Sequence, residues 1–165
     1  MSHELDMSNN RANMAYVGET PWHELGHPIS EDASFEEWGE KSGLFFEIKK
    51  AKMVARLEDG TTFDASGLNR SILYRTDTNA PLSVMSTDFY KIHQPREMLQ
   101  FIFESAEAMG YKMHTAGSLY GGRKIWALAR IPEAVAEVGK GDELRGYLLA
   151  ATACDGSMGF NEAAA

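Results

Sequence analysis

The sequence predicts an α+β fold, an antiparallel sheet built from hairpins with one long helix packed on one face and an irregular N-terminal arm. Three observations support this fold class. Apolar residues alternate with polar ones through residues 44–57, Asp59-Gly60 is a strong hairpin turn signal, and a helical period runs through about residues 95–109. The composition, 44% hydrophobic and 24% charged, is that of a globular protein.

The first 33 residues are predicted to form an irregular acidic arm, and residues 34–165 a single α+β domain. Asparagine, glycine and proline interrupt any regular pattern in the arm. The net charge is −8, and residues 1–40 hold nine acids against one base, Arg11, whereas the remainder is balanced. Such an arm is typical of a solvated or partner-facing segment. Its charge also disfavours nonspecific binding to duplex DNA, which requires a positive surface.

The sequence also predicts a cytoplasmic protein without a membrane partner. No apolar run approaches the roughly 20 residues of a membrane helix. The polar, acidic start of the chain does not have the pattern of a signal peptide. A single cysteine, Cys154, cannot form a disulfide within the chain, which fits a reducing compartment.

Two helices have recognisable ends in the sequence. Ser34 and Glu37 form a capping box, which predicts a short helix over residues 35–41. Pro95 suits the first turn of the long helix over residues 95–109, because a missing amide costs nothing at that position. A glycine follows the last turn of this helix and is a natural stop.

Three hairpins are predicted from strand-like runs that turn residues separate. Their paired strands lie within residues 44–57 and 61–63, 71–75 and 82–85, and 111–116 and 124–129. A short helical connection over residues 132–138 then leads to a last strand over residues 144–153. The chain ends soon after a turn at Asp155-Gly156, which predicts a shortened version of a longer protein.

One motif suggests metal chemistry. His23, Glu24 and His27 have the H-E-x-x-H spacing of zinc hydrolases, in which two histidines on one helix face bind zinc and the glutamate activates water. Pro28 disfavours a helical conformation at His27, and Gly26 weakens a helix further. We therefore predict no helix, no metal and no cofactor here. A zinc hydrolase with His23 and His27 as ligands and Glu24 as base is the alternative.

We expect the residues around this motif to be structural. Trp22 is expected to anchor the arm, His23 to make a hydrogen bond, and the run Gly26-His27-Pro28 to form a turn. Trp22, His23 and Gly26 are thus predicted to serve the fold rather than catalysis.

Basic strand residues interleaved with tyrosines predict a surface for single-stranded nucleic acid, where cations meet phosphates and aromatic rings stack on bases. The predicted phosphate contacts are Lys50, Lys52, Arg56, Arg123 and Lys124, and the predicted stacking residues are Tyr90 and Tyr120. Lysines that merely decorate solvated strand faces are the alternative explanation. The sequence contains neither a phosphate-binding loop motif nor a G-x-S-x-G nucleophile motif.

Several segments occur together, in order, over nearly the whole chain. They are Met14-Ala15-Tyr16-Val17-Gly18-Glu19-Thr20-Pro21-Trp22-His23, Leu25-Gly26, Asp88-Phe89-Tyr90-Lys91 with Pro95, Thr115-Ala116-Gly117-Ser118-Leu119, Gly121-Gly122-Arg123-Lys124-Ile125-Trp126, and Asp155-Gly156-Ser157. On these segments the chain resembles a phage- and plasmid-borne family, domain of unknown function 932.

The resemblance implies a role in mobile-element DNA metabolism or in interference with the host, within the cytoplasm of a bacterial host. Members do not require a glutamate after the Trp-His pair or a second histidine, which implies that the H-E-x-x-H match is accidental. They usually continue past the Asp-Gly-Ser turn with further strand and helix. The order of strands and helix is also similar to the core of phage single-strand annealing proteins, by analogy of fold alone.

We therefore predict a non-enzymatic protein that binds nucleic acid in replication or recombination. A second hypothesis, from a different class, is a protein-binding factor whose acidic arm engages a basic host target such as a defence nuclease. The zinc hydrolase is the third. The sequence is compatible with a homo-oligomer.

Overall fold

The computed structural model describes residues 4–137, 143–157 and 161–164. Its strands are β1 (Met14–Tyr16), β2 (His27–Pro28), β3 (Ile48–Lys52), β4 (Val54–Arg56), β5 (Thr62–Asp64), β6 (Arg70–Arg75), β7 (Pro81–Ser86), β8 (Lys112–Leu119), β9 (Lys124–Glu137), β10 (Glu143–Ala153) and β11 (Asn161–Ala164). Its α-helices are α1 (Phe35–Ser42) and α2 (Pro95–Met109), and short 3-10 helices lie at Ser8–Asn10, Ser66–Leu68 and Tyr120–Gly122. The predicted α+β class is confirmed.

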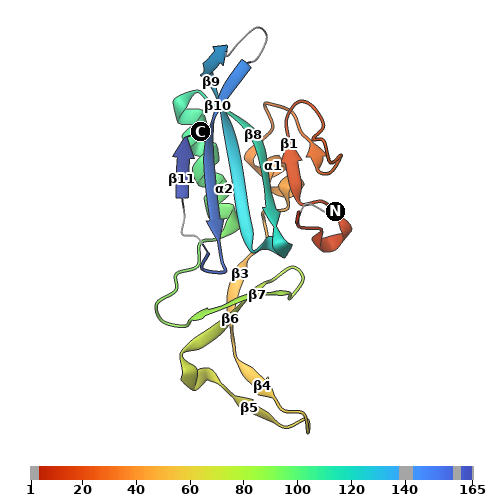
Figure 1. The fold of residues 1–165 in the computed structure, drawn as a ribbon, viewed down its shortest axis with the longest axis vertical. Helices are drawn as coiled ribbons and strands as arrows, with labels where there is room; N and C mark the ends of the chain where they lie inside the picture. Colours follow the sequence, from red (N-terminus) through yellow and green to blue (C-terminus); the bar gives the residue numbers. More distant parts are fainter. Residues whose placement is uncertain (1–3, 138–142, 158–160, 165) are drawn as a thin grey trace.

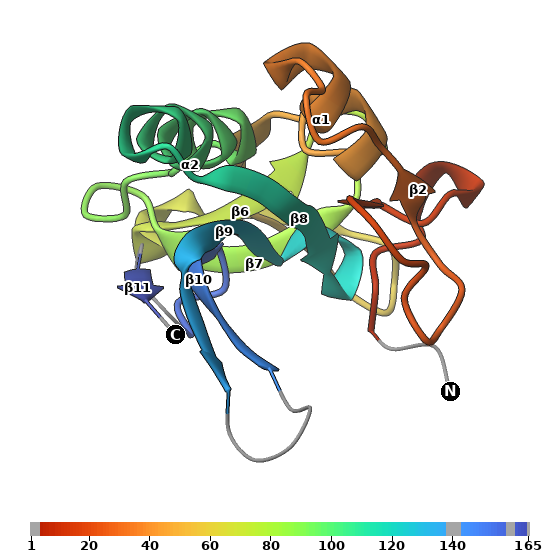
Figure 2. The same ribbon diagram turned by 90° about the horizontal axis from the view of Figure 1, so that it is seen from above.

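Three sheets follow one another along the long axis of the molecule (Figure 1). The largest has the order β11-β10-β9-β8-β1-β2, the next has the order β3-β6-β7, and the hairpin β4-β5 projects at the far end. Both helices cover the same face of the six-stranded sheet (Figure 2). The prediction of one long helix over residues 95–109, packed on one sheet face, is confirmed. No helix among the described residues has both the length and the apolar character to cross a membrane.

The helix ends follow the capping rules. The Ser34 hydroxyl accepts a hydrogen bond from the Glu37 amide at 3.2 Å, and α1 ends at a glycine with φ 70°. Pro95 begins α2, as expected. The Gln94 side chain before it exchanges two hydrogen bonds with the backbone of Ile48, both 2.9 Å long. The start of α2 is therefore tied to β3.

A close-fitting apolar layer joins α2 to the sheet. Its buried members are Met98, Leu99, Ile102 and Ala106 from the helix, and Ala116, Ala127, Ala129 and Ala150 from the strands. Small side chains on the sheet let the helix backbone approach closely, and the larger helix side chains then fill the space at the density of a protein interior.

The three predicted hairpins are confirmed as β4-β5, β6-β7 and β8-β9, and their turns include residues 59–60, 77–79 and 120–122, respectively. The expected last strand is β10, and it also pairs with β11. Each of these turns contains glycine, asparagine or aspartate between runs with strand periodicity, which is a local signal that needs no tertiary information.

Residues 4–33 are mostly irregular, as predicted, but two short strands join this segment to the largest sheet. β1 pairs antiparallel with β8, with Ala15 opposite Ala116, and parallel with β2. The predicted turn at Gly26-His27-Pro28 is wrong, because His27 and Pro28 form β2. Proline, which has no amide N–H to donate, is tolerated there because β2 is the edge strand of the sheet that the described residues form.

Strand pairing corrects two other local predictions. The helical connection expected over residues 132–138 is wrong in its described part, because β9 continues to Glu137 and pairs with β10. Val138 lies outside the described residues. The strand expected within residues 44–57 is split at Met53, so that β3 and β4 belong to different sheets. In both places, packing against partner strands outweighs the local preference of the chain.

A buried ion network joins distant parts of the chain. The Arg75 guanidinium at the end of β6 donates to Asp6 at 2.7 Å, and both side chains are almost completely buried. It also donates to both carboxylate oxygens of Asp77, at 2.7 and 2.8 Å, and lies over the ring of Phe46. Burial alone would raise the pKa of Asp6, but hydrogen bonds from Ser8 and Arg75 lower it below its ordinary value. One acid of the predicted acidic arm is therefore internal.

Candidate functional site

Two neighbouring hollows lie where β8 begins. The Trp22 pocket has a volume of about 560 Å³, and its lining includes Tyr16, Trp22, His23, His114, Arg130 and Arg145. The Trp38 pocket has a volume of about 370 Å³, and its lining includes Trp38, Phe103, Ala106, Glu107 and Tyr111. Glu31, Lys112 and Met113 border both pockets, so the two hollows adjoin.

The chain around Trp22 is shaped by a turn and by one glycine. The Glu24 amide donates to the Pro21 carbonyl at 2.8 Å, which closes the turn. Gly26 has a φ of 101°, and a Cβ at this position would lie 3.1 Å from the carbonyl oxygen of Met14, so the position favours glycine. The side chain of Trp22 is left 80% exposed. The expectation that Trp22 anchors this segment is therefore wrong.

The strands β8, β9 and β10 supply the positive charge of the Trp22 pocket. Lys112 and Arg130 lie opposite each other across β8 and β9, and Arg145 follows on β10. The His114 ring packs edge-on against Tyr147, with 5.1 Å between centroids. Burial, and then the charges of Arg130 and Arg145, lower the pKa of His114 below its ordinary value. The pocket thus combines an exposed indole, a neutral imidazole at pH 7 and three cations, against two carboxylates in its lining.

His23, Glu24 and His27 do not lie on a helix, which agrees with the prediction. The two histidines also have different surroundings. The Nδ1 atom of His23 accepts a hydrogen bond from the Leu25 amide at 3.1 Å, which confirms the expected hydrogen bond. Glu24 has a φ of 56°, in the left-handed region. His27 lies in β2, where burial, and then the charges of Arg11 and Lys41, lower its pKa. Across the described ranges, no three His, Cys, Asp or Glu side chains are grouped to hold a metal ion.

Lys50 and Tyr90, two of the predicted nucleic-acid contacts, are engaged within the fold. The Lys50 ammonium donates to the carbonyl oxygens of Thr87 and Tyr90, at 2.6 and 2.8 Å. Tyr90 is half-buried and packs against the main core, and burial raises the pKa of its phenol. Lys50 therefore holds the segment that follows β7 against β3, and the ring of Tyr90 helps to seat it.

The other five predicted contacts lie in two places. Lys52 in β3 and Arg56 in β4 are exposed on the two smaller sheets. Tyr120, Arg123 and Lys124 lie at the turn between β8 and β9, where the Lys124 ammonium is 5.3 Å from the centroid of the Tyr120 ring. The structure therefore brings three of the predicted residues together, in a small aromatic and basic cluster.

Sequence reasoning did not find the Trp22 pocket, because its charges depend on strand register. Arg130 lies opposite Lys112 on one side and opposite Tyr147 on the other, and the β9-β10 register shifts between Arg145 and Tyr147. A slip of one residue in either ladder would turn these side chains to the opposite face. The signal that the sequence did carry is the run at Trp22, one of the segments on which the family resemblance rests.

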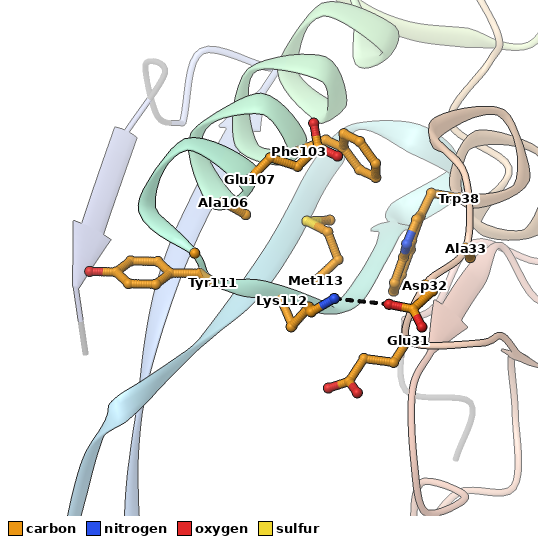
Figure 3. A pocket seen from close by; sticks show the side chains of 11 residues that line it. Glu31, Asp32, Ala33, Trp38, Phe103, Ala106, Glu107, Tyr111, Lys112 and Met113 are labelled. Carbon is orange, nitrogen blue, oxygen red and sulfur yellow. Dashed lines mark hydrogen bonds and ion pairs between the residues drawn. The ribbon is translucent and has the colours of Figure 1, made fainter.

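Side chains from α1, α2 and the start of β8 line the Trp38 pocket (Figure 3). Asp32 and Lys112 form an ion pair of 2.9 Å at this pocket. Trp38 is 0% exposed, and its indole nitrogen has no acceptor among the described residues. A buried donor without a partner costs about 1–3 kcal/mol. The pocket therefore has a hydrogen-bonding group that the described fold does not use.

These observations define an α+β protein with two adjoining pockets, one basic and aromatic, the other apolar with carboxylates in its lining. The chain belongs to the family described as domain of unknown function (DUF932), whose model matches residues 81–165, just over half of the chain. The match confirms the resemblance found in the sequence motifs, and it includes α2 and the strands β8, β9 and β10. No curated protein and no solved structure matches the chain significantly.

Proposed function

We propose that this protein binds single-stranded nucleic acid at the Trp22 pocket, without catalysing a reaction. The observation that carries the proposal is an indole, 80% exposed, beside a cluster of three cations. Tryptophan side chains are highly buried on average, so an indole this exposed is unusual, and an aromatic face beside basic groups suits a base and its phosphate. The resemblance to phage- and plasmid-borne proteins supports a role in replication or recombination of a mobile element, in the bacterial cytoplasm.

In the proposed complex, Trp22 stacks on a base while Arg130 and Arg145 neutralise neighbouring phosphates. Lys112 keeps its ion pair with Asp32. Stacking tolerates any sequence, because every base has an aromatic face. The protein carries a net charge of −8, so attraction to phosphate must come from this local cluster and not from the whole surface. Binding is therefore expected to weaken steeply as salt is added. The cluster at Tyr120 and Lys124 lies outside the pocket and is the competing location for a phosphate contact.

Anisotropy of a fluorescent single-stranded oligonucleotide, titrated at two salt concentrations, tests the proposal. Trp22→Ala should weaken binding about 5- to 150-fold, because stacking on an aromatic side chain contributes about 1–3 kcal/mol per base. Arg145→Gln should weaken binding and reduce the slope of log K against log salt by about 0.7, the value for one phosphate contact on a single strand.

Arg123→Gln is the matched control, because it removes an exposed arginine outside the Trp22 pocket. It should change affinity much less than Arg145→Gln. A larger loss for Arg123→Gln would place the contact at the turn between β8 and β9 and contradict the Trp22 pocket. If the unaltered protein does not bind the oligonucleotide even at low salt, the nucleic-acid proposal is wrong.

A further inference from the structure

The Trp38 pocket adjoins the Trp22 pocket but differs from it in chemistry. We infer that it receives one unstacked base that carries an exocyclic amine, such as cytosine or adenine. The inference rests on the proposed function, since the base belongs to the strand that the Trp22 pocket holds. Glu31, Lys112 and Met113 form the shared border, so a strand that crosses it places a base in one hollow and its phosphates in the other.

The volume of the Trp38 pocket and the apolar side chains in its lining suit a planar ring. Its volume of about 370 Å³ lies within the range of roughly 300–1,000 Å³ that ligand pockets occupy. Phe103, Ala106 and Met113 supply apolar surface. Proteins that extract a base hold it between aromatic and apolar side chains and recognise it by hydrogen bonds to its Watson–Crick edge.

Trp38 supplies the hydrogen-bond donor. Its side chain is fully buried, and the indole nitrogen has no acceptor among the residues that the structure describes. Figure 3 shows the indole of Trp38 across the pocket from Met113 and Lys112. Methionine is flexible, so Met113 can move aside and let a ring nitrogen or carbonyl oxygen of the base reach the indole N–H.

Two carboxylates supply the selectivity. Glu107, in the last turn of α2, and Glu31, in the segment before α1, line the pocket, whereas the neighbouring Asp32 is neutralised by Lys112. A glutamate accepts a hydrogen bond from the exocyclic amine of cytosine. It repels the carbonyl oxygen that uracil and thymine carry at the same position. The carboxylates also repel phosphate, so the backbone of the strand stays on the arginine side.

The test compares two single strands that differ only in this group. Labelled oligomers of deoxycytidine and of deoxyuridine, each of about 12 nucleotides, match the usual length of a single-strand site. The unaltered protein should bind the cytidine oligomer at least about fivefold more tightly, the lower end of the discrimination from one good base contact. Glu107→Gln should reduce this preference to less than about twofold, because the amide of glutamine can also donate to the carbonyl of uracil.

Glu104→Gln is the matched control, since Glu104 is exposed one turn earlier on α2 and does not line the pocket. It should keep the full preference, and thermal unfolding should show that both variants are folded. Equal binding of the two oligomers by the unaltered protein overturns the base pocket while the proposed function stands. A preference that survives in Glu107→Gln overturns it as well. If neither oligomer binds, the proposed function itself fails.

Discussion

The imidazole of His114 lies against Tyr147 and within reach of the charges of Arg130 and Arg145. Burial first, and these two positive charges second, lower its pKa from the ordinary value of 6.5. The folded protein therefore holds a neutral imidazole beside two permanent cations. A phosphate bound near the arginines would cancel part of their effect and raise the pKa of His114 again.

Replacing this histidine should change how stability responds to acid. As pH falls below about 6.5, the unfolded chain takes up a proton at His114 that the folded protein resists, so the free energy of unfolding decreases. His114→Gln removes this proton uptake. Urea unfolding at about pH 7.5 and about pH 5.5, on either side of the ordinary histidine pKa, should therefore show a smaller loss of stability in the variant.

The exposed His93 provides the control for this experiment. His93→Gln should lose as much stability between the two pH values as the unaltered protein. An unchanged acid response in His114→Gln would show that the pocket does not hold this imidazole in its neutral form.

The facing pair Gly117 and Trp126 shows how two of the family motif segments contact each other. Gly117 lies in the segment of β8, and Trp126 lies in the segment that leads into β9. The two residues lie opposite each other in the ladder, and the Trp126 indole N–H donates to the Thr115 hydroxyl at 3.2 Å. A Cβ at position 117 would lie 2.5 Å from the Trp126 ring and 2.7 Å from the Asn13 carbonyl oxygen. The indole therefore occupies the space of the absent side chain, and the backbone of Asn13, just before β1, closes that space from the other side.

Gly117→Ala should destabilise the protein by about 1–3 kcal/mol, the usual cost of added volume in a packed interior. Neither the ring nor the backbone of Asn13 can move without disturbing the sheet. The matched control is Gly67→Ala, because a Cβ at Gly67 would meet nothing within 4 Å. Denaturant unfolding should show a clear loss for Gly117→Ala and almost none for Gly67→Ala. Similar midpoints for the two variants would contradict this account of the pair.

Across the whole molecule, the buried Arg75 connects three regions that are far apart in sequence. It donates to Asp6 in the N-terminal segment and to the Gly121 carbonyl, at 3.0 Å, in the turn between β8 and β9. Its own strand, β6, is the centre of the three-stranded sheet. Asp6 in turn accepts hydrogen bonds from Asn13 and Ser118. One charged cluster thus links the N-terminal segment and both of the larger sheets.

Arg75→Met should therefore lower the free energy of unfolding by about 3–5 kcal/mol, because it leaves the carboxylate of Asp6 buried without its cation. Denaturant unfolding measures the loss. The control is Lys49→Met, which breaks an exposed ion pair with Glu47, and such pairs contribute little. Equal effects of the two substitutions would mean that the Asp6–Arg75 pair does not hold the parts of the molecule together.

Much of the secondary structure was predictable because its signals are local. The cap at Ser34, the turn at Asp59-Gly60 and the run of apolar residues in α2 each depend on a few neighbours in the chain. The predictions that failed involve pairing with a distant partner. Residues 132–137 form a strand because they pair with β10. Pro28 lies in an edge strand of the sheet and not in a turn.

For the candidate site too, local features were predictable from the sequence and features that depend on distant partners were not. Residue types and spacing were sufficient to recognise the family, to expect an α+β fold and to argue that the H-E-x-x-H segment is not helical, because a proline and a glycine act on their immediate neighbours. They were not sufficient to place Trp22 at the surface or to gather Lys112, Arg130 and Arg145 around it. Those positions depend on the register of three strands, and register is set by the packing of the whole sheet against α2 and not by any short segment of the chain.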